Sequence, residues 1–213
     1  MAAPPTPGRF ITLEGGEGAG KSTQARLLAQ ALRDAGQAVA ETREPGGAPG
    51  AEALRELLLH GPTAFVPEAE TLLHFAARAE HLARTIRPAL AAGRWVVCDR
   101  FADSTMAYQG YGLGVDRAMI ATLTALLETK PDLTLVLDVS AATASARLAG
   151  RGRAADRYEA LDPAFHERVR QGFRDIAAAA PERCVTIDAD PAPHAVHAAV
   201  LAAVRARFGN VAK

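Results

Sequence analysis

The sequence predicts an α/β fold of three layers, in which a parallel sheet of five strands is wrapped by helices. Two observations lead to this prediction. Short apolar runs alternate along the chain with longer stretches that carry apolar residues at helical spacing, which is typical of a parallel sheet covered by helices. The first short run also leads into a glycine-rich loop and then a helical stretch, the order in which such sheets bind phosphate groups.

Five strands and seven helices follow from this alternation. The strands are expected at residues 10–13, 38–42, 95–98, 133–138 and 184–188. Their apolar continuity fits strands that are buried on both faces. The helices are expected at residues 22–35, 51–59, 68–92, 116–128, 141–148, 163–179 and 192–208.

The chain is expected to form one domain over residues 9–213. No internal repeat and no linker divides it, and 49% apolar residues are ample for a core in a chain of 213 residues. Residues 1–8 are rich in alanine and proline but lack the basic start and apolar core of a secretory signal. They predict a short flexible tail.

The charge balance argues against several classes of partner. The 24 basic and 24 acidic residues leave no formal net charge, so no surface for nucleic acid or for an anionic membrane is predicted. No apolar run reaches the roughly 18 residues that a membrane-spanning helix needs. Cys98 and Cys184 lie in apolar runs without the spacing of a metal site, which predicts buried free thiols in a reducing cytoplasm.

The glycine-rich loop at residues 15–22 matches the pattern G-x-x-x-x-G-K-[ST] in full. Its glycines let backbone N–H groups turn inward around phosphate oxygens. The side chain of Lys21 adds a mobile positive charge for the outer phosphates, and the hydroxyl of Ser22 can bind Mg²⁺. The loop therefore predicts a nucleotide phosphate site.

Charged residues follow two further strands of the predicted sheet. Arg43 comes at the end of the second strand, and Asp99 with Arg100 at the end of the third. Ligands of such sheets bind beyond the carboxyl ends of the strands. Arg43 and Arg100 are suited to a second phosphate, and Asp99 to a magnesium site. Asp138, at the end of the fourth strand, is the alternative for the magnesium site, and the arginine beside Asp99 favours Asp99.

Three other segments carry side chains suited to a nucleotide. Residues 104–112 combine hydroxyls, an aromatic ring and an amide, which suit a base and a sugar, or alternatively form a polar loop over the sheet. Phe75 and Arg78 lie one helical turn apart, where a ring and a guanidinium could meet a base, although such a Phe is more often part of a core. The arginine-rich run at 147–159 predicts a mobile flap that brings positive charge to a transferring phosphoryl group, rather than a solvated loop.

Taken together, these segments resemble bacterial thymidylate kinases. The resemblance extends from residue 10 to about residue 208 and rests on residues 10–23, 42–47, 76–78, 99–101, 104–105, 107–110 and 156–159. The blocks R-E-P-G-G and D-R-F-x-x-S-T-x-A-Y-Q-G are the specific part, because the phosphate loop is shared by many NTP-binding families.

The resemblance implies an enzyme with the P-loop nucleoside monophosphate kinase fold. Such an enzyme moves the γ-phosphoryl group of ATP to dTMP, giving dTDP and ADP in dTTP biosynthesis, with Mg²⁺ and usually as a cytoplasmic homodimer. Two alternatives remain open from the residues: a kinase for another nucleoside monophosphate, and a regulatory protein that binds an NTP without transferring phosphate.

The resemblance also implies roles for individual residues. ATP would be held by Gly15, Gly16, Glu17, Gly18, Ala19, Gly20, Lys21, Ser22 and Thr23, with Arg147 against adenine. Ser22 and Asp99 would hold Mg²⁺. The residues implied for dTMP are Arg43, Phe75, Arg78, Arg100, Thr105, Tyr108 and Gln109.

Catalysis would depend on Lys21, Arg100, Asp99 and Glu17 together with the flap arginines Arg151, Arg153 and Arg157. Because Gly18 stands where some relatives have a basic residue, the sequence resembles the members that supply this charge from the flap. Which flap arginine meets the phosphate stays open. His74, four residues before Arg78, is the alternative to Phe75 for stacking on the base, and Phe75 is preferred because a phenyl ring stacks without titrating.

Overall fold

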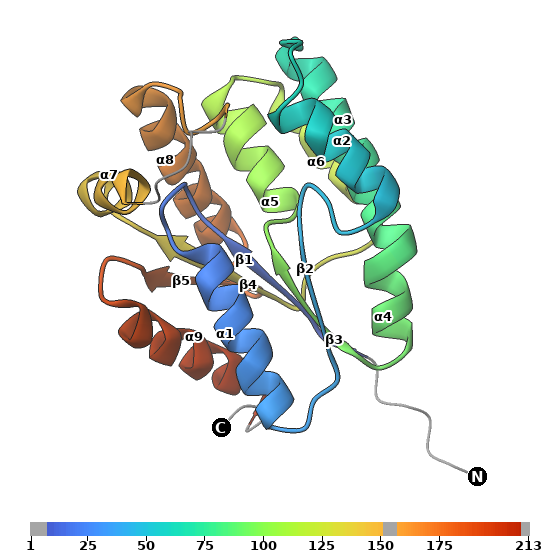
Figure 1. Ribbon diagram of the computed structural model, residues 1–213, viewed down its shortest axis with the longest axis vertical. Coiled ribbons are helices and arrows are strands. Elements are labelled where there is room, and N and C mark those ends of the chain that lie inside the picture. The colour runs from blue at the N-terminus through green and yellow to red at the C-terminus, as the bar shows by residue number, and fades with distance from the viewer. Residues whose placement is uncertain (1–7, 151–156, 210–213) are drawn as a thin grey trace.

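The computed structural model describes residues 8–150 and 157–209, and its centre is a five-stranded parallel sheet (Figure 1). The predicted tail, apart from Gly8, and the predicted flap residues Arg151 and Arg153 lie outside these ranges. The strands are β1 (Phe10–Glu14), β2 (Val39–Arg43), β3 (Trp95–Asp99), β4 (Leu133–Asp138) and β5 (Cys184–Asp188). Their order across the sheet is β2-β3-β1-β4-β5, and every neighbouring pair is parallel. The predicted α/β fold class and its five strands are confirmed.

The helices fall close to the predicted ranges. In the described part of the chain they are α1 (Lys21–Asp34), α2 (Pro49–Leu59), α3 (Pro67–His81), α4 (Arg87–Ala91), α5 (Ala102–Thr105), α6 (Arg117–Leu126), α7 (Ala141–Ala149), α8 (Pro163–Ala179) and α9 (Pro193–Phe208). Two π-helical segments join them, η1 (Leu82–Ile86) and η2 (Met106–Gly112). The predicted helix at 68–92 is a continuous run of α3, η1 and α4, in which the π turn precedes Pro88, a residue without an N–H to donate.

Residues 102–112 are helical in the structure, as α5 and η2, although no helix was predicted there. Glycine and short polar residues give this stretch weak helix propensity. Its helical form depends on tertiary packing, because η2 lies along α8 and buries Ala107, Tyr108 and Gln109. Single π turns are frequent at functional sites, and η2 lines the site described below.

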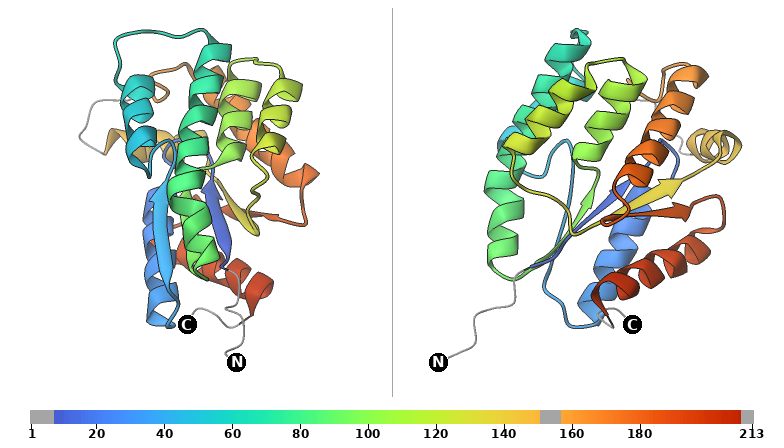
Figure 2. Two further views of the ribbon diagram at one scale, coloured as in Figure 1. Left: turned by 90° about the vertical axis from the view of Figure 1, so that its right-hand side faces the viewer. Right: turned by 180° about the vertical axis from the view of Figure 1, so that it is seen from behind.

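The two faces of the sheet bury alternate residues of each strand, as the period of two requires. Ile11 and Leu13 of β1 pack on one face with α1 and α9. Phe10 points to the other face and packs against η1 and α4. Also on this second face, Val136 of β4 contacts α8 and η2. Figure 2 shows the resulting layers, with α1 and α9 on one side of the sheet and α4 and α8 on the other.

The register of the sheet brings the charged strand ends together. Asp99 lies opposite Leu13 of β1 and opposite Arg43 of β2. The phosphate loop, Arg43 and the pair Asp99-Arg100 therefore meet at one edge, as the sequence predicted from the carboxyl ends of the strands. No helix in the described ranges is long and apolar enough to cross a membrane.

Candidate active site

The phosphate loop joins β1 to α1 and takes backbone conformations that glycine favours. Gly18 has φ +72°, and a Cβ placed there would lie 2.8 Å from backbone atoms of Ala144. Gly15 has φ +137°, and its Cβ would lie 2.4 Å from the carbonyl oxygen of Leu137. No side chain caps the N-terminus of α1. The first N–H groups of this helix and the positive end of its dipole are therefore directed at the loop, an arrangement that binds phosphate.

Lys21 is buried in the first turn of α1, and its ammonium group curls back onto the loop. Nζ donates to the carbonyl oxygens of Gly15 at 3.0 Å and Gly16 at 2.7 Å. Burial, together with the positive charge of Arg100, lowers the pKa of Lys21 to about 8. At neutral pH most of the protein therefore keeps a cation beneath the loop.

Ser22 and Asp99 form an oxygen pair suited to magnesium. The Ser22 hydroxyl donates to Asp99 Oδ2 at 2.5 Å, while Asp99 Oδ1 is buried without a hydrogen-bond partner in the described chain. Mg²⁺ takes oxygen ligands, commonly one or two from the protein and the rest from phosphates and water, so this pair fits it. The alternative residue, Asp138, is instead held by Arg170 at 2.6 Å and Arg174 at 2.7 Å.

Arg100 bonds to several groups at this edge, and its backbone has φ +71°. Nη1 donates to Gly15 O at 3.1 Å and Ser104 Oγ at 3.2 Å, and Nη2 to Glu17 Oε1 at 2.5 Å and Tyr108 OH at 3.0 Å. Burial would lower the pKa of Arg100, but the Glu17 carboxylate raises it well above its ordinary value. The Tyr108 hydroxyl also donates to Glu17 Oε1, at 2.7 Å, so the three side chains form one unit.

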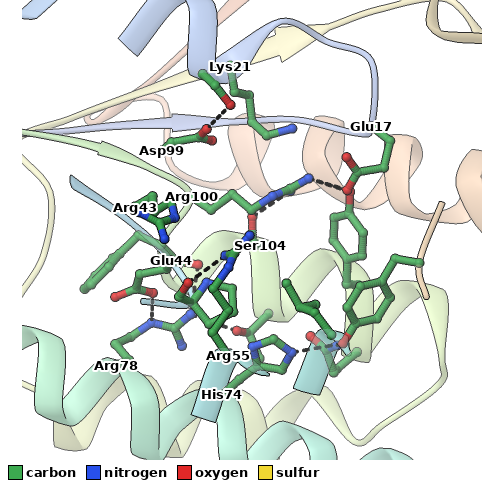
Figure 3. Close-up of a pocket in the computed structure, with 18 of the residues that line it drawn as sticks. Glu17, Lys21, Arg43, Glu44, Arg55, His74, Arg78, Asp99, Arg100 and Ser104 are labelled. Atoms are coloured by element: carbon green, nitrogen blue, oxygen red, sulfur yellow. Dashed lines mark hydrogen bonds and ion pairs between the residues drawn. The ribbon is translucent and has the colours of Figure 1, made fainter. Parts of the chain in front are cut away.

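A cavity of about 200 Å³ extends from Lys21 and Asp99 past Arg100 to His74 and Arg78 (Figure 3). It joins the phosphate loop to a second compartment rich in arginine. The residues around it are Glu17, Gly20, Lys21, Ser22, Arg43, Glu44, Pro45, Arg55, Leu59, His74, Arg78, Asp99, Arg100, Phe101, Ser104, Thr105, Tyr108, Gln109 and Tyr158.

Arg78 is buried at the far end of the cavity and is held from several sides. Its Nε donates to Glu44 Oε2 at 2.6 Å, and its Nη2 to Phe101 O at 3.0 Å and Thr105 Oγ1 at 2.9 Å. The guanidinium carbon lies 5.0 Å from the centre of the Phe75 ring. Nη1 is buried and has no partner among the described residues. This N–H group is a donor left for a ligand.

Arg43 and Arg55 line the side of the cavity nearer to α2. Arg43 is half-exposed and bonds to both carboxylate oxygens of Glu52, at 3.1 and 3.0 Å. Arg55 donates to Pro45 O at 2.7 Å. Sequence reasoning missed Arg55, because it stands on an ordinary amphipathic helix outside any motif.

The structure does not bring Phe75 to the cavity, although the sequence favoured it over His74. Phe75 packs with Val115 and Ile120 and covers the back of Arg78. His74 lines the cavity instead. Adjacent residues of an α-helix point about 100° apart, so only one of the two can face the ligand once the apolar face of α3 is buried.

Two of the predicted arginines near the flap have defined positions. Arg147, at the end of α7, donates to Gly18 O at 3.3 Å and to Pro191 O at 3.0 Å, beside the phosphate loop. Arg157 lies 2.8 Å from the Glu70 carboxylate. Arg151 and Arg153 lie outside the described residues.

Buried carboxylates that sequence reasoning missed hold the site in place. Glu14, at the end of β1, accepts hydrogen bonds from Phe101 N at 2.8 Å and Ser104 Oγ at 2.6 Å. Burial and the nearby Asp103 raise the pKa of Glu14 to about 7. A charged residue at the end of an apolar strand was the available signal. Glu44 of the R-E-P-G-G block likewise bridges Arg78 and His81.

The fold and site together define a class of enzyme. A phosphate loop at the first strand, a serine–aspartate pair beside it and a facing compartment with buried arginines suit transfer between two phosphates. The chain is a nucleoside monophosphate kinase.

Comparison with known proteins identifies the family. The family model of thymidylate kinase matches residues 13–200. The thymidylate kinase of Gluconobacter oxydans is 56% identical, with 92% of this chain and 94% of that protein covered, and that of Rhizorhabdus wittichii is 55% identical, with 93% and 97% covered. The crystal structure of thymidylate kinase from Ehrlichia chaffeensis superposes with a TM-score of 0.76 at 38% identity, covering 93% of this chain and 99% of that one. The chain belongs to the thymidylate kinase family.

Proposed function

We propose that this enzyme transfers the γ-phosphoryl group of ATP to dTMP, giving dTDP and ADP for dTTP biosynthesis. The observation that carries the proposal is one continuous cavity, which connects Lys21 and the N-terminus of α1 to a compartment walled by Arg43, Arg78 and Arg100. A donor phosphate on the loop and an acceptor phosphate in that compartment would meet near Arg100. Membership of the thymidylate kinase family supports the choice of acceptor over other nucleoside monophosphates and over a regulatory NTP-binding role.

The substrates would divide the site between them. The loop residues 15–23 hold the ATP phosphates, and Arg147 lies against adenine. Arg43 and Arg100 clamp the phosphate of dTMP, Tyr108 lies under the deoxyribose, and the thymine edge meets the groups at the far end of the cavity, Arg78, Thr105 and Gln109. We assign His74, in place of Phe75, to the contact with the base because His74 lines the cavity.

Ser22 and Asp99 would hold Mg²⁺ together with phosphate oxygens. Two observations support this assignment. Ser22 Oγ lies 2.5 Å from Asp99 Oδ2, and Asp99 Oδ1 has no hydrogen-bond partner in the described chain. Bound there, the ion neutralises charge on the ATP phosphates.

Alignment and charge neutralisation would suffice for the transfer. The acceptor oxygen belongs to a phosphate that is ionised at neutral pH, so no strong general base is required. Lys21 and Arg100 supply fixed positive charge, and Asp99 and Glu17 hold the magnesium and Arg100 in place. The flap arginines Arg151, Arg153 and Arg157 are proposed to add charge during transfer.

The proposal extends to the state of the whole protein. We propose one kinase domain at residues 9–213, acting as a cytoplasmic homodimer without a nucleic-acid or membrane partner. The zero formal net charge supports the last point.

A coupled assay of ADP release tests the function. ATP with Mg²⁺ is offered with dTMP, dUMP, dCMP, UMP or AMP, and ATP alone is the control. We expect ADP formation that depends on the acceptor, with the highest kcat/KM for dTMP. ADP release that does not rise with any acceptor would contradict the kinase reaction, and a clear preference for another monophosphate would contradict dTMP as substrate.

A further inference from the structure

We propose that Tyr158 is a positioning residue whose hydroxyl fixes the direction of the hydrogen bonds at the base end of the cavity. Through these hydrogen bonds, Tyr158 makes the site selective for a base with an imide edge, which is a carbonyl group beside a ring N–H. This inference rests on the proposed function, because it concerns how the acceptor base is read.

The Tyr158 hydroxyl forms hydrogen bonds with three side chains in the described part of the chain. It donates to Glu70 Oε1 at 2.6 Å, accepts from Gln109 Nε2 at 2.9 Å, and lies 2.9 Å from His74 Nε2. A hydroxyl has one proton to donate and two lone pairs to accept with. Since the proton goes to the carboxylate of Glu70, His74 Nε2 has to be the donor in the third bond.

This bond selects one tautomer of His74. Burial and the neighbouring cations Arg78, Arg100 and Arg157 lower the pKa of His74 to about 3, so the ring is neutral at pH 7 and carries one proton. With that proton on Nε2, Nδ1 keeps a lone pair. His74, which lines the cavity, therefore keeps an acceptor atom besides the bonded Nε2.

The same network sets the orientation of the Gln109 amide. Its Nε2 donates to Tyr158 OH and, at 3.0 Å, to Glu70 Oε1. A carboxylate oxygen accepts only, so the nitrogen has to face Glu70 and both of its hydrogens are used. The carbonyl oxygen of Gln109 remains as the acceptor of this side chain.

The base end thus has a fixed polarity, with the Arg78 guanidinium as a donor and with Gln109 and His74 as acceptors. The donor is Nη1 of Arg78, which is buried and has no partner in the described chain. A base with an imide edge offers a carbonyl to the arginine and an N–H to an acceptor. An amidine edge, as in cytosine, offers an amino group and an unprotonated ring nitrogen, so it would leave both sets of groups unpaired.

Packing and charge keep Tyr158 in place. The residue is buried, with its ring edge-on to Tyr108 at 5.4 Å between ring centres. The preceding residue, Arg157, lies 2.8 Å from Glu70, the same carboxylate that accepts from the hydroxyl. The ion pair between Arg157 and Glu70 therefore holds in place the carboxylate that accepts the Tyr158 proton.

Nitrogen NMR of the free protein tests the tautomer without any substrate. Long-range ¹H–¹⁵N correlation on ¹⁵N-histidine protein distinguishes Nε2–H from Nδ1–H rings, and a His74→Gln variant identifies the His74 signals. At pH 7 we expect the neutral Nε2–H form in the wild type and a shift towards Nδ1–H in Tyr158→Phe. A wild-type ring that is protonated or carries its proton on Nδ1 overturns the proposal, whether or not the variant folds.

Kinetics test the effect on selectivity. In Tyr158→Phe we expect KM for dTMP to rise about tenfold, kcat to change less than about threefold, and the ratio of kcat/KM for dTMP over dCMP to fall about tenfold. Tyr111→Phe is the matched control, because that ring packs against Gly172 and Arg117 outside the cavity lining, and its constants should match the wild type.

The outcomes separate the two proposals. A wild type without activity on dTMP contradicts the proposed function, while the NMR result still decides the direction of the network. A normal wild type with an unchanged dTMP-to-dCMP ratio in Tyr158→Phe overturns the role of Tyr158 alone.

Discussion

Arg100 has a left-handed backbone conformation that few residues other than glycine adopt. Such strain persists where the surroundings impose it, and here Leu13 O accepts from Arg100 N at 2.9 Å while Glu14 holds the next residue, Phe101. As a result, the Arg100 guanidinium contacts both the phosphate loop and Glu17. Neither the strain nor these contacts can be read from the dipeptide Asp99-Arg100 in the sequence.

Removing single cations should abolish most of the turnover while the fold remains. We expect Lys21→Ala, Arg43→Ala and Arg100→Ala each to lower kcat/KM about 100-fold or more, because preorganised charge at the transferring phosphate is lost. Arg33→Ala is the control, since Arg33 forms an exposed pair with Glu41. Steady-state kinetics with circular dichroism as a fold check measures this, and near-normal turnover in any of the three removes that residue from the site.

The buried carboxylate of Glu14 should make stability depend on pH in a defined window. Its folded pKa of about 7 exceeds an unfolded value of about 4.3, so the folded state binds the proton more tightly between these values. The stability that this group contributes is complete below about pH 4.3 and is lost as the pH rises through 7.

A Glu14→Gln variant lacks this titration. Between pH 4.5 and 7.5 we expect the free energy of unfolding of the wild type to fall, relative to the variant, by roughly 3 kcal/mol. Urea unfolding of both proteins at several pH values gives this difference, in which other titrations cancel. A difference that stays constant with pH would contradict the raised pKa.

At the scale of elements, the phosphate loop depends on the packing of α7 as well as on its own glycines. We expect Gly18→Ala to lower the free energy of unfolding by about 2 kcal/mol or more and to raise KM for ATP about tenfold, because its Cβ would meet the backbone of Ala144 at 2.8 Å. Gly36→Ala shares the positive φ but has no atom within 4 Å of the added Cβ.

Comparing Gly18→Ala with Gly36→Ala separates the effect of backbone strain from the effect of the steric clash with α7. Gly36→Ala should cost about 1 kcal/mol and leave KM unchanged. Thermal unfolding and ATP titration report both quantities, and equal effects of the two substitutions would exclude a role for the contact between loop and helix.

Elements with strong local patterns were predictable from the sequence, and those built by contacts were not. The helix at 163–179 has the predicted bounds, with Asp162 capping Phe165 N at 2.7 Å. The helical form of 102–112 was missed, because Gly110 and Gly112 weaken it locally and its stability comes from α8. The preference for Phe75 over His74 depended on the direction of one helix face, which needs the neighbours of α3.

At the scale of the whole molecule, the proposed homodimer can be tested at an exposed apolar side chain. Leu126, at the end of α6, is 72% exposed. A charge introduced at such a position disturbs an interface that covers it. We expect light scattering to give a mass near twice the 22.3 kDa of the chain.

A charge in this region should weaken the dimer. Leu126→Glu is expected to shift the mass towards one chain, whereas Val185→Glu, at a 37% exposed position of edge strand β5, should leave it unchanged. A monomeric wild type would contradict the proposed homodimer, and a dimeric Leu126→Glu would place its interface elsewhere.

The sequence by itself determined the α/β class, the strands, the phosphate loop and the meeting of Arg43, Asp99 and Arg100 at one edge. These features follow from local periodicity, glycine chemistry and the common direction of parallel strands. Only the tertiary structure decided that His74 lines the cavity, that Glu14 holds the segment after Arg100, that Glu44 holds Arg78, and that Tyr158 joins Glu70, Gln109 and His74. Those contacts join residues about 30 to 90 positions apart, and their geometry depends on how helices pack over the sheet, which no local pattern records.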